Sequence, residues 1–147
     1  MTQEDKELLL KDLCARLPYG VICHYDTIVP MFDKVKSYGR LYNISFFDIK
    51  PCFQFHCNRD VFDFDNVKPY LFPLSSMTEE QQEEFDRIYA DDMQVVANNL
   101  KNRLDGKPYE TNLGHYRHID WLNANHFDYR GLIPKELAID ATGLNIY

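Results

Sequence analysis

Cysteine and histidine stand next to each other at two places in the sequence, as Cys23-His24 and His56-Cys57. Thiolate and imidazole are ligands for zinc and for other transition metals. Each pair lies in a segment of strand-like composition, where neighbouring side chains point to opposite faces of a sheet, so neither pair can hold one ion alone. Because the cysteines also lack a CxxC spacing, we predict no metal site and no cofactor.

An enzyme or a metal-binding protein with an unfamiliar Cys/His site is the first alternative. Its residues would come together only through the fold, and the candidates are Cys23, His24, His56, Cys57 and His126. The familiar catalytic and phosphate-binding motifs are missing, since the chain has no glycine-flanked serine elbow and no GxGxxG or GxxxxGK loop. We therefore predict no catalytic residues and favour a protein that is not an enzyme.

The stretch WLNANHFDYRGLIPKELA, residues 121–138, concentrates side chains that could form either a catalytic cluster or a structural clasp. A catalytic interpretation would use His126 with Asp128. The structural interpretation places Trp121 in the sheet or against a long helix, and lets Asp128 and Arg130 pair with each other or with backbone ends. We favour the clasp because it accounts for these residues without chemistry.

The acidity of the chain bears on its partners. Its net charge is -7, with 9 basic and 10 acidic side chains in residues 1–77 and 7 and 13 in residues 78–147. Nucleic-acid binders usually present a basic face to the phosphates, so a module that binds or mimics nucleic acid is only the second alternative. No membrane span is expected, and the acidic start without a signal-peptide pattern leads us to expect a cytoplasmic protein.

The elements that must position these residues form a single α+β domain over residues 1–147. An N-terminal helix is predicted in 1–19, with Thr2 as N-cap and an apolar stripe of Leu10, Leu13, Cys14 and Leu17, so that the Cys14 thiol is expected to be buried. Residues 20–77 read as short antiparallel strands separated by Gly39, Pro51 and the polar residues 58–60. They would form a small antiparallel sheet, either curled or closed as an SH3-like barrel, and residues 67–77 its proline-punctuated exit.

A long acidic helix is predicted in 78–105 and a short Trp-anchored segment in 106–147. Thr78 and Gln81 fit a capping box, and Gly106 can end the helix. An apolar stripe predicts that one face of the helix is buried, while its end could project or pair with another copy. The stripe comprises Phe85, Ile88, Tyr89, Val96, Leu100 and Leu104.

These observations predict an interaction or accessory protein that binds a protein partner, or a second copy of itself, through the sheet and its loops, roughly residues 25–65. Aromatic side chains are common at the centres of protein interfaces, and this segment is rich in them. The predicted binding residues are Phe32, Tyr38, Tyr42, Phe46 and Phe47.

Three segments carry a resemblance to a known family: KDLCARLPYGVICHY, VKPYLFPLSSMTEEQ and WLNANHFDYRGLIPKELAIDA. Together they resemble a family of small uncharacterised proteins recurrent in gut Bacteroidales genomes and their phages or prophages. The resemblance spans nearly the whole chain but departs from the family pattern in residues 27–65 and at the tail TGLNIY. It implies a cytosolic setting and a mobile-element origin, and it supplies no activity and no catalytic residues.

Overall fold

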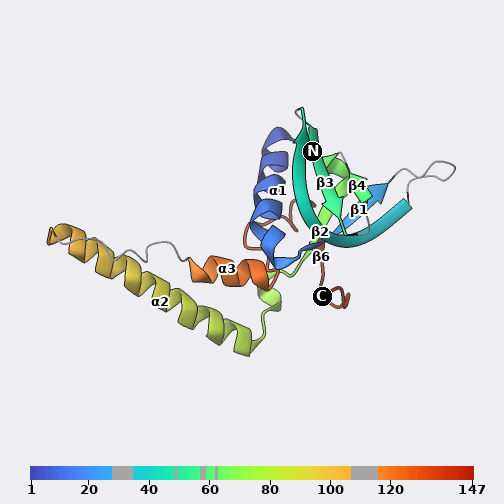
Figure 1. The fold of residues 1–147 in the computed structure, drawn as a ribbon. Coiled ribbons are helices and arrows are strands. Elements are labelled where there is room, and N and C mark those ends of the chain that lie inside the picture. The colour runs from blue at the N-terminus through green and yellow to red at the C-terminus, as the bar shows by residue number, and fades with distance from the viewer. Residues whose placement is uncertain (28–34, 49, 57–58, 62, 107–115) are drawn as a thin grey trace.

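A computed structural model describes residues 1–27, 35–48, 50–56, 59–61, 63–106 and 116–147. The chain is an α+β protein in which α1 (Gln3–Arg16) packs on a curled sheet, while α2 (Glu79–Leu104) and α3 (Arg117–Ala124) extend away from it (Figure 1). Short 3-10 turns, η1 (Leu17–Tyr19), η2 (Phe64–Asn66) and η3 (Leu74–Ser76), connect the elements. No helix in these ranges is both long and apolar enough to cross a membrane.

The sheet has six strands in the order β4-β3-β2-β1-β5-β6. It is open, with β4 and β6 at its edges, and so is not a closed SH3-like barrel. All neighbours pair antiparallel except β5 and β6, which are parallel and make the sheet mixed. The strands are β1 (Ile22–Thr27), β2 (Val35–Phe47), β3 (Lys50–Phe55), β4 (Arg59–Val61), β5 (Val67–Leu71) and β6 (Ile139–Asp140).

Three expectations about the strands are wrong. Pro51 does not separate two strands, because it pairs with Phe46 inside β3. Gly39 does not end a strand, because it pairs with Cys23 inside the 13-residue β2. Residues 67–71 are not an exit loop but the strand β5, which pairs with β1 on one side and with β6 on the other. Its Pro69 pairs with Cys23 of β1, and only the two residues after Pro69 pair with β6. The alternating burial of β5 shows why a strand is stable there: Val67 and Leu71 are fully buried in the core.

The predicted N-terminal helix is confirmed, including its capping box, in which the Thr2 and Asp5 side chains each accept from the other's backbone N–H. The buried stripe of α1, however, consists of Leu9, Asp12, Leu13 and Arg16. Of the expected stripe, Leu13 is fully buried, Leu10 and Leu17 are half-buried and Cys14 is not buried, because the ion pair of Asp12 and Arg16 takes up part of the face turned to the core. Cys14 is exposed, so the prediction of a buried thiol is wrong.

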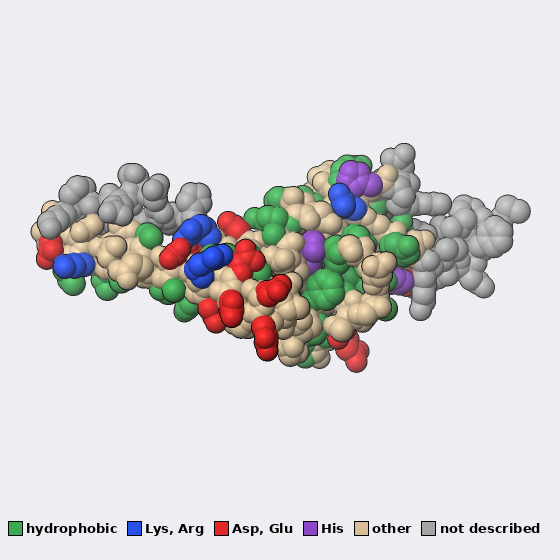
Figure 2. Space-filling view, turned by 90° about the horizontal axis from the view of Figure 1, so that it is seen from below, with side chains coloured by type: hydrophobic (Ala, Val, Ile, Leu, Met, Phe, Trp, Pro, Cys, Tyr) green, Lys and Arg blue, Asp and Glu red, His purple; other side chains and the backbone are tan. Residues whose placement is uncertain are grey.

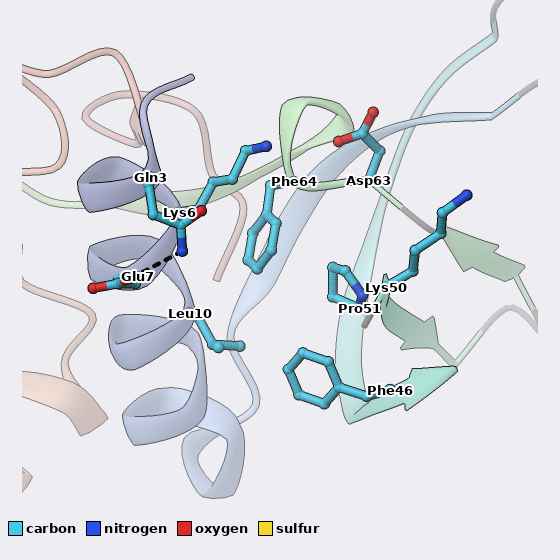
Figure 3. Close-up of a pocket in the computed structure, with 9 residues that line it drawn as sticks. All are labelled: Gln3, Lys6, Glu7, Leu10, Phe46, Lys50, Pro51, Asp63 and Phe64. Carbon is cyan, nitrogen blue, oxygen red and sulfur yellow. Dashed lines mark hydrogen bonds between the residues drawn. The ribbon is translucent and has the colours of Figure 1, made fainter. Parts of the chain in front are cut away.

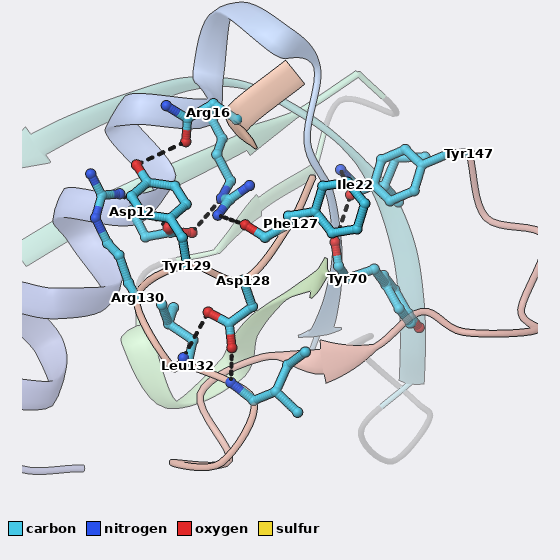
Figure 4. Close-up of polar contacts among 12 residues, drawn as sticks. Asp12, Arg16, Ile22, Tyr70, Phe127, Asp128, Tyr129, Arg130, Leu132 and Tyr147 are labelled. Carbon is cyan, nitrogen blue, oxygen red and sulfur yellow. Dashed lines mark hydrogen bonds and ion pairs between the residues drawn. The ribbon is translucent and has the colours of Figure 1, made fainter. Parts of the chain in front are cut away.

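The buried polar network of α1 fastens the C-terminal segment to the body (Figure 4). Arg16 Nε lies 2.7 Å from Asp12 Oδ2, and an Nη of Arg16 donates to the Phe127 carbonyl at 2.7 Å. Arg130 reaches the other Asp12 oxygen at 3.1 Å. Asp12 and Arg16 are fully buried, and 111 residues separate Arg16 from Phe127, so the network ties the two ends of the chain together.

Residues 121–138 act as the predicted clasp. Trp121 packs against Phe85 of α2 and stacks on Phe127, with ring centroids 5.8 and 5.7 Å apart. Phe127 forms a bridge with Phe72 at the end of β5. Asp128 accepts hydrogen bonds from the backbone N–H groups of Leu132 and Ile133 at 2.9 and 2.8 Å, which is the expected pairing with backbone ends.

The long helix begins and ends as predicted, between its Thr78–Gln81 capping box and residue 105. The expected burial of its apolar face is wrong from Tyr89 onward, since Tyr89 is 45% exposed. Phe85 and Ile88 are half-buried, whereas Val96, Leu100 and Leu104 are exposed, because the described part of the chain covers α2 only near α3.

A polar cluster holds α3 against the middle of α2. The Asp92 carboxylate accepts from the His118 backbone N–H at 3.0 Å, contacts His118 Nδ1 at 2.7 Å, and accepts from Arg117 Nε at 2.9 Å. Burial raises the pKa of Asp92, but the hydrogen bonds from His118 and Arg117 outweigh it and lower the pKa to about 2.

Acidification is expected to release α3 from α2. Because the pKa of Asp92 is lower in the folded chain than the ordinary value near 3.9, its stabilising effect is complete above about pH 4 and is lost as the pH falls toward about 2. Fluorescence of Trp121, the single tryptophan, reports this contact because its ring lies against Phe85. We expect the fluorescence to change between pH 4 and 2 in the wild type and much less in Asp92→Asn. Identical acid profiles for the two chains would contradict the assignment.

Candidate functional site

A groove lies between α1 and the neighbouring ends of β2 and β3, with a volume of about 550 Å³ (Figure 3). Its apolar lining is formed by Leu10 of α1, Phe46 of β2, Pro51 of β3 and Phe64. Leu10, Phe46 and Phe64 point into the space between helix and strands. The Phe46 side chain is 53% exposed, although it lies next to the core. Concave sites of this size with an apolar lining are typical places for a ligand side chain to bind.

Leu10 reaches the groove because of the polar network of α1. With Asp12 and Arg16 turned into the core, Leu9 and Leu13 are fully buried beside them. Leu10 lies 100° round the helix axis from Leu9 and is half-buried, at the border between core and solvent. A charged pair inside the core therefore leaves an apolar side chain at the edge of the groove.

Phe46 reaches the groove because of a β-bulge. Leu41 pairs with Phe55 and Asn43 with Gln54, so the register shifts around Tyr42. An extra residue in a strand reverses the faces of all residues that follow it. Phe46 consequently lies opposite Pro51, on the face that carries the core residue Phe53, and not on the face of Tyr38.

The rim of the groove is charged, with Lys6 and Glu7 on α1 and Lys50 and Asp63 on the opposite side. Glu7 accepts from the Gln3 side-chain amide at 2.9 Å, and Asp63 accepts from the Asp65 backbone N–H at 3.2 Å. Among the described residues neither lysine has an ion-pair partner. Within the described ranges, the rim therefore offers two ammonium groups without an ion-pair partner, while its carboxylates accept hydrogen bonds from neutral groups.

The five predicted binding residues do not form one surface. Tyr38 and Tyr42 are 65% and 45% exposed, and the ring of Tyr42 lies 5.0 Å from that of His56. Tyr38 pairs with His24, on the face opposite the core, whereas Phe46 lies in the groove. For Phe47 only its backbone place in β2 is described, and Phe32 lies outside the described residues. Leu10, Phe64 and both lysines of the groove were not predicted as binding residues from the sequence.

The cysteine and histidine candidates are dispersed. Cys23 is fully buried, and desolvation raises the pKa of its thiol, so it is protonated and inert. His24 lies on the other face of β1 beside Asp26, at 3.4 Å, and His56 is exposed at the end of β3. Cys57 lies outside the described residues. Within the ranges that the structure describes, no three Cys, His, Asp or Glu residues are grouped to hold a metal ion.

His126 and Asp128 are engaged separately, so the catalytic interpretation of this pair lacks support. The His126 ring stacks on Tyr147 at 3.8 Å, with its backbone in the left-handed region at φ 58°. Burial, followed by the charges of Arg16 and Arg40, lowers the pKa of His126 to about 4, so its ring is neutral at physiological pH. The Tyr147 hydroxyl donates to the Tyr70 carbonyl at 2.7 Å, which fixes the C-terminus to β5.

Comparisons with protein-family models, curated proteins and solved structures found no match to this chain. The resemblance of three segments to the Bacteroidales family therefore stays a prediction.

Proposed function

We propose that this chain is a non-enzymatic interaction protein that binds a segment of a protein partner in the groove between α1 and the β2–β3 ends. One observation carries the proposal: Phe46 is 53% exposed within a concave apolar lining. Covering an aromatic ring with a partner removes its apolar surface from water, and buried aromatic anchors dominate the affinity of many interfaces. A cytosolic setting and a mobile-element origin, which the resemblance implies, belong to the same proposal.

The chemistry of the groove selects the partner segment. Leu10, Phe46 and Phe64 fit one apolar side chain inserted between helix and strands. Lys6 and Lys50 stand at the rim without ion-pair partners among the described residues, and they favour carboxylates next to the inserted side chain. We therefore propose an acidic peptide segment with a central apolar anchor.

The dispersal of the cysteine and histidine candidates supports a binding role over an enzymatic one. A catalytic site needs a nucleophile or an acid-base group within hydrogen-bonding reach of its partners. Cys23 is inside the core, and His24, His56 and His126 lie in separate surroundings of the described structure. The groove, in contrast, brings apolar and charged side chains from three parts of the chain to one place.

Peptide selection tests the proposal. A random peptide display library is panned on the wild-type chain, and the enriched peptides are measured by fluorescence polarisation. We expect peptides with an apolar residue flanked by acids, and an affinity that falls by about tenfold or more in Phe46→Ser, as for an interface anchor. Lys6→Gln and Lys50→Gln are expected to weaken binding less and to reduce its dependence on salt.

Leu144→Ser is the matched control, since Leu144 is another exposed apolar residue, at 44%, and does not line the groove. We expect it to leave the affinity unchanged. Because Phe46 is largely exposed, Phe46→Ser is also expected to unfold at the wild-type temperature, which separates lost binding from lost folding. The proposal fails if the wild type enriches no peptide, or if the enriched peptides bind Phe46→Ser as tightly as the wild type.

A further inference from the structure

One face of α2 carries a stripe of apolar side chains from Tyr89 to Leu104. At its start the ring of Tyr89 also contacts that of His118 on α3, at 5.3 Å between centroids. Tyr89 and Val96 are each 45% exposed, Leu100 is 59% exposed and Leu104 is 80% exposed. The helix projects from the sheet body in Figure 1, and hydrophobic side chains follow one edge of the projecting part in Figure 2. Neighbouring exposed side chains of this size mark a surface that binds another protein surface.

The spacing of the stripe is that of a helix-pairing seam. Tyr89, Met93, Val96 and Leu100 follow one another at intervals of four, three and four residues. This is the alternation of a and d positions with which two helices pack side chains into each other. Leu104, four residues after Leu100, extends the stripe to the end of α2. The partner that fits such a seam is another α-helix.

The charge distribution of α2 indicates which helix is the partner and in which direction the partner helix runs. Residues 79–92 contain seven acidic side chains and one basic side chain, whereas residues 93–104 contain two basic and no acidic ones. A parallel pair of α2 helices would place the two acidic halves together. An antiparallel pair keeps the two acidic halves apart and places the basic end, with Lys101 and Arg103, beside the exposed Asp91 of the other helix.

We propose that α2 forms the interface of an antiparallel homodimer, with the two stripes packed against each other. Centred on the stripe, this arrangement places Tyr89 opposite Leu104 of the second copy and Met93 opposite its Leu100. The paired region spans 16 residues, about 24 Å of helix, so the interface is small and its dimer dissociates on dilution. The inference is independent of the proposed groove, which lies at α1 and the sheet.

Molar mass as a function of concentration tests the dimer. By sedimentation equilibrium, we expect the mass to rise from the 17.4 kDa of one chain toward twice that value as the protein concentration increases. Leu100→Glu places a carboxylate in the middle of the seam, and we expect it to weaken the dimer by at least about tenfold in Kd. Tyr38→Ser, an equally exposed position on the sheet, is the matched control and should dimerise like the wild type.

Disulfide trapping tests whether the two α2 helices run antiparallel. Two differently tagged chains, one with Tyr89→Cys and one with Leu104→Cys, are mixed under mild oxidation, both carrying Cys14→Ser because Cys14 is exposed. The antiparallel dimer predicts a disulfide between the two different chains. A mass of 17.4 kDa at every concentration, or disulfides formed only between identical chains, would overturn the proposal.

Discussion

Replacing Asp12 with alanine is expected to lower the free energy of unfolding by about 3–5 kcal/mol, the cost of leaving a buried charge without its partner. Asp12 is fully buried and contacts two guanidinium groups, those of Arg16 at 2.7 Å and Arg130 at 3.1 Å. The substitution would leave the buried Arg16 without its carboxylate and loosen the link between α1 and the C-terminal segment. Urea unfolding followed by circular dichroism measures the loss.

Two further variants show whether the loss of stability comes from the buried ion pair. Lys11→Ala removes an exposed charge from the same helix, and surface changes of this kind shift stability by no more than about 0.5 kcal/mol. The double variant Asp12→Leu with Arg16→Met removes both buried charges and is expected to recover a large part of the loss, because the pair is costly to desolvate. An Asp12→Ala chain within 0.5 kcal/mol of the wild type would mean that the network contributes little, contrary to our description.

The second large effect is expected at Asp128. Its carboxylate accepts from two backbone N–H groups, those of Leu132 at 2.9 Å and Ile133 at 2.8 Å, and it is 7% exposed. Hydrogen bonds to a charged group contribute about 1.5–3 kcal/mol each, so Asp128→Ala should cost about 3 kcal/mol. Amide hydrogen exchange is the specific readout, since the N–H groups of Leu132 and Ile133 should lose protection before the core does.

Asp140 provides the control for Asp128. It also accepts a backbone hydrogen bond, from Thr142 at 2.8 Å, but its side chain is exposed. Asp140→Ala is therefore expected to cost no more than about 1 kcal/mol. If Asp128→Ala and Asp140→Ala were equally mild, or if exchange at Leu132 and Ile133 stayed slow, the Asp128 carboxylate would not be the group that holds the clasp.

Features encoded by local spacing were predictable from the sequence. Both capping boxes, at Thr2 and Thr78, depend on residues three positions apart, and α2 begins and ends where those signals place it. The α+β class and the clasp at residues 121–138 also follow from composition and periodicity. The capping boxes join near neighbours in the chain, whereas for the clasp only the apolar and polar composition of the segment was informative, since its contacts reach Phe85, Phe72 and Arg16.

Features created by distant contacts were not predictable. Arg130 pairs with Asp12, 118 residues away, so α1 buries charges that a helical pattern assigns to solvent and exposes Cys14. The bulge at Tyr42 separates Phe46 from Tyr38, although their even spacing places both on one face of a regular strand. Leu10 borders the groove because of the first of these features and Phe46 because of the second, and neither placement follows from a local pattern in the sequence.

The most direct test of the binding function is photo-crosslinking from inside the groove. A chain carrying p-benzoylphenylalanine in place of Phe46 is expressed in cells of its native host and irradiated, with the same residue in place of Leu144 as the control. We predict one discrete protein adduct from position 46 that is absent from position 144, attached at an acidic segment with an apolar anchor. No adduct from position 46, or the same adducts from both positions, would contradict the proposal that this groove binds a protein partner.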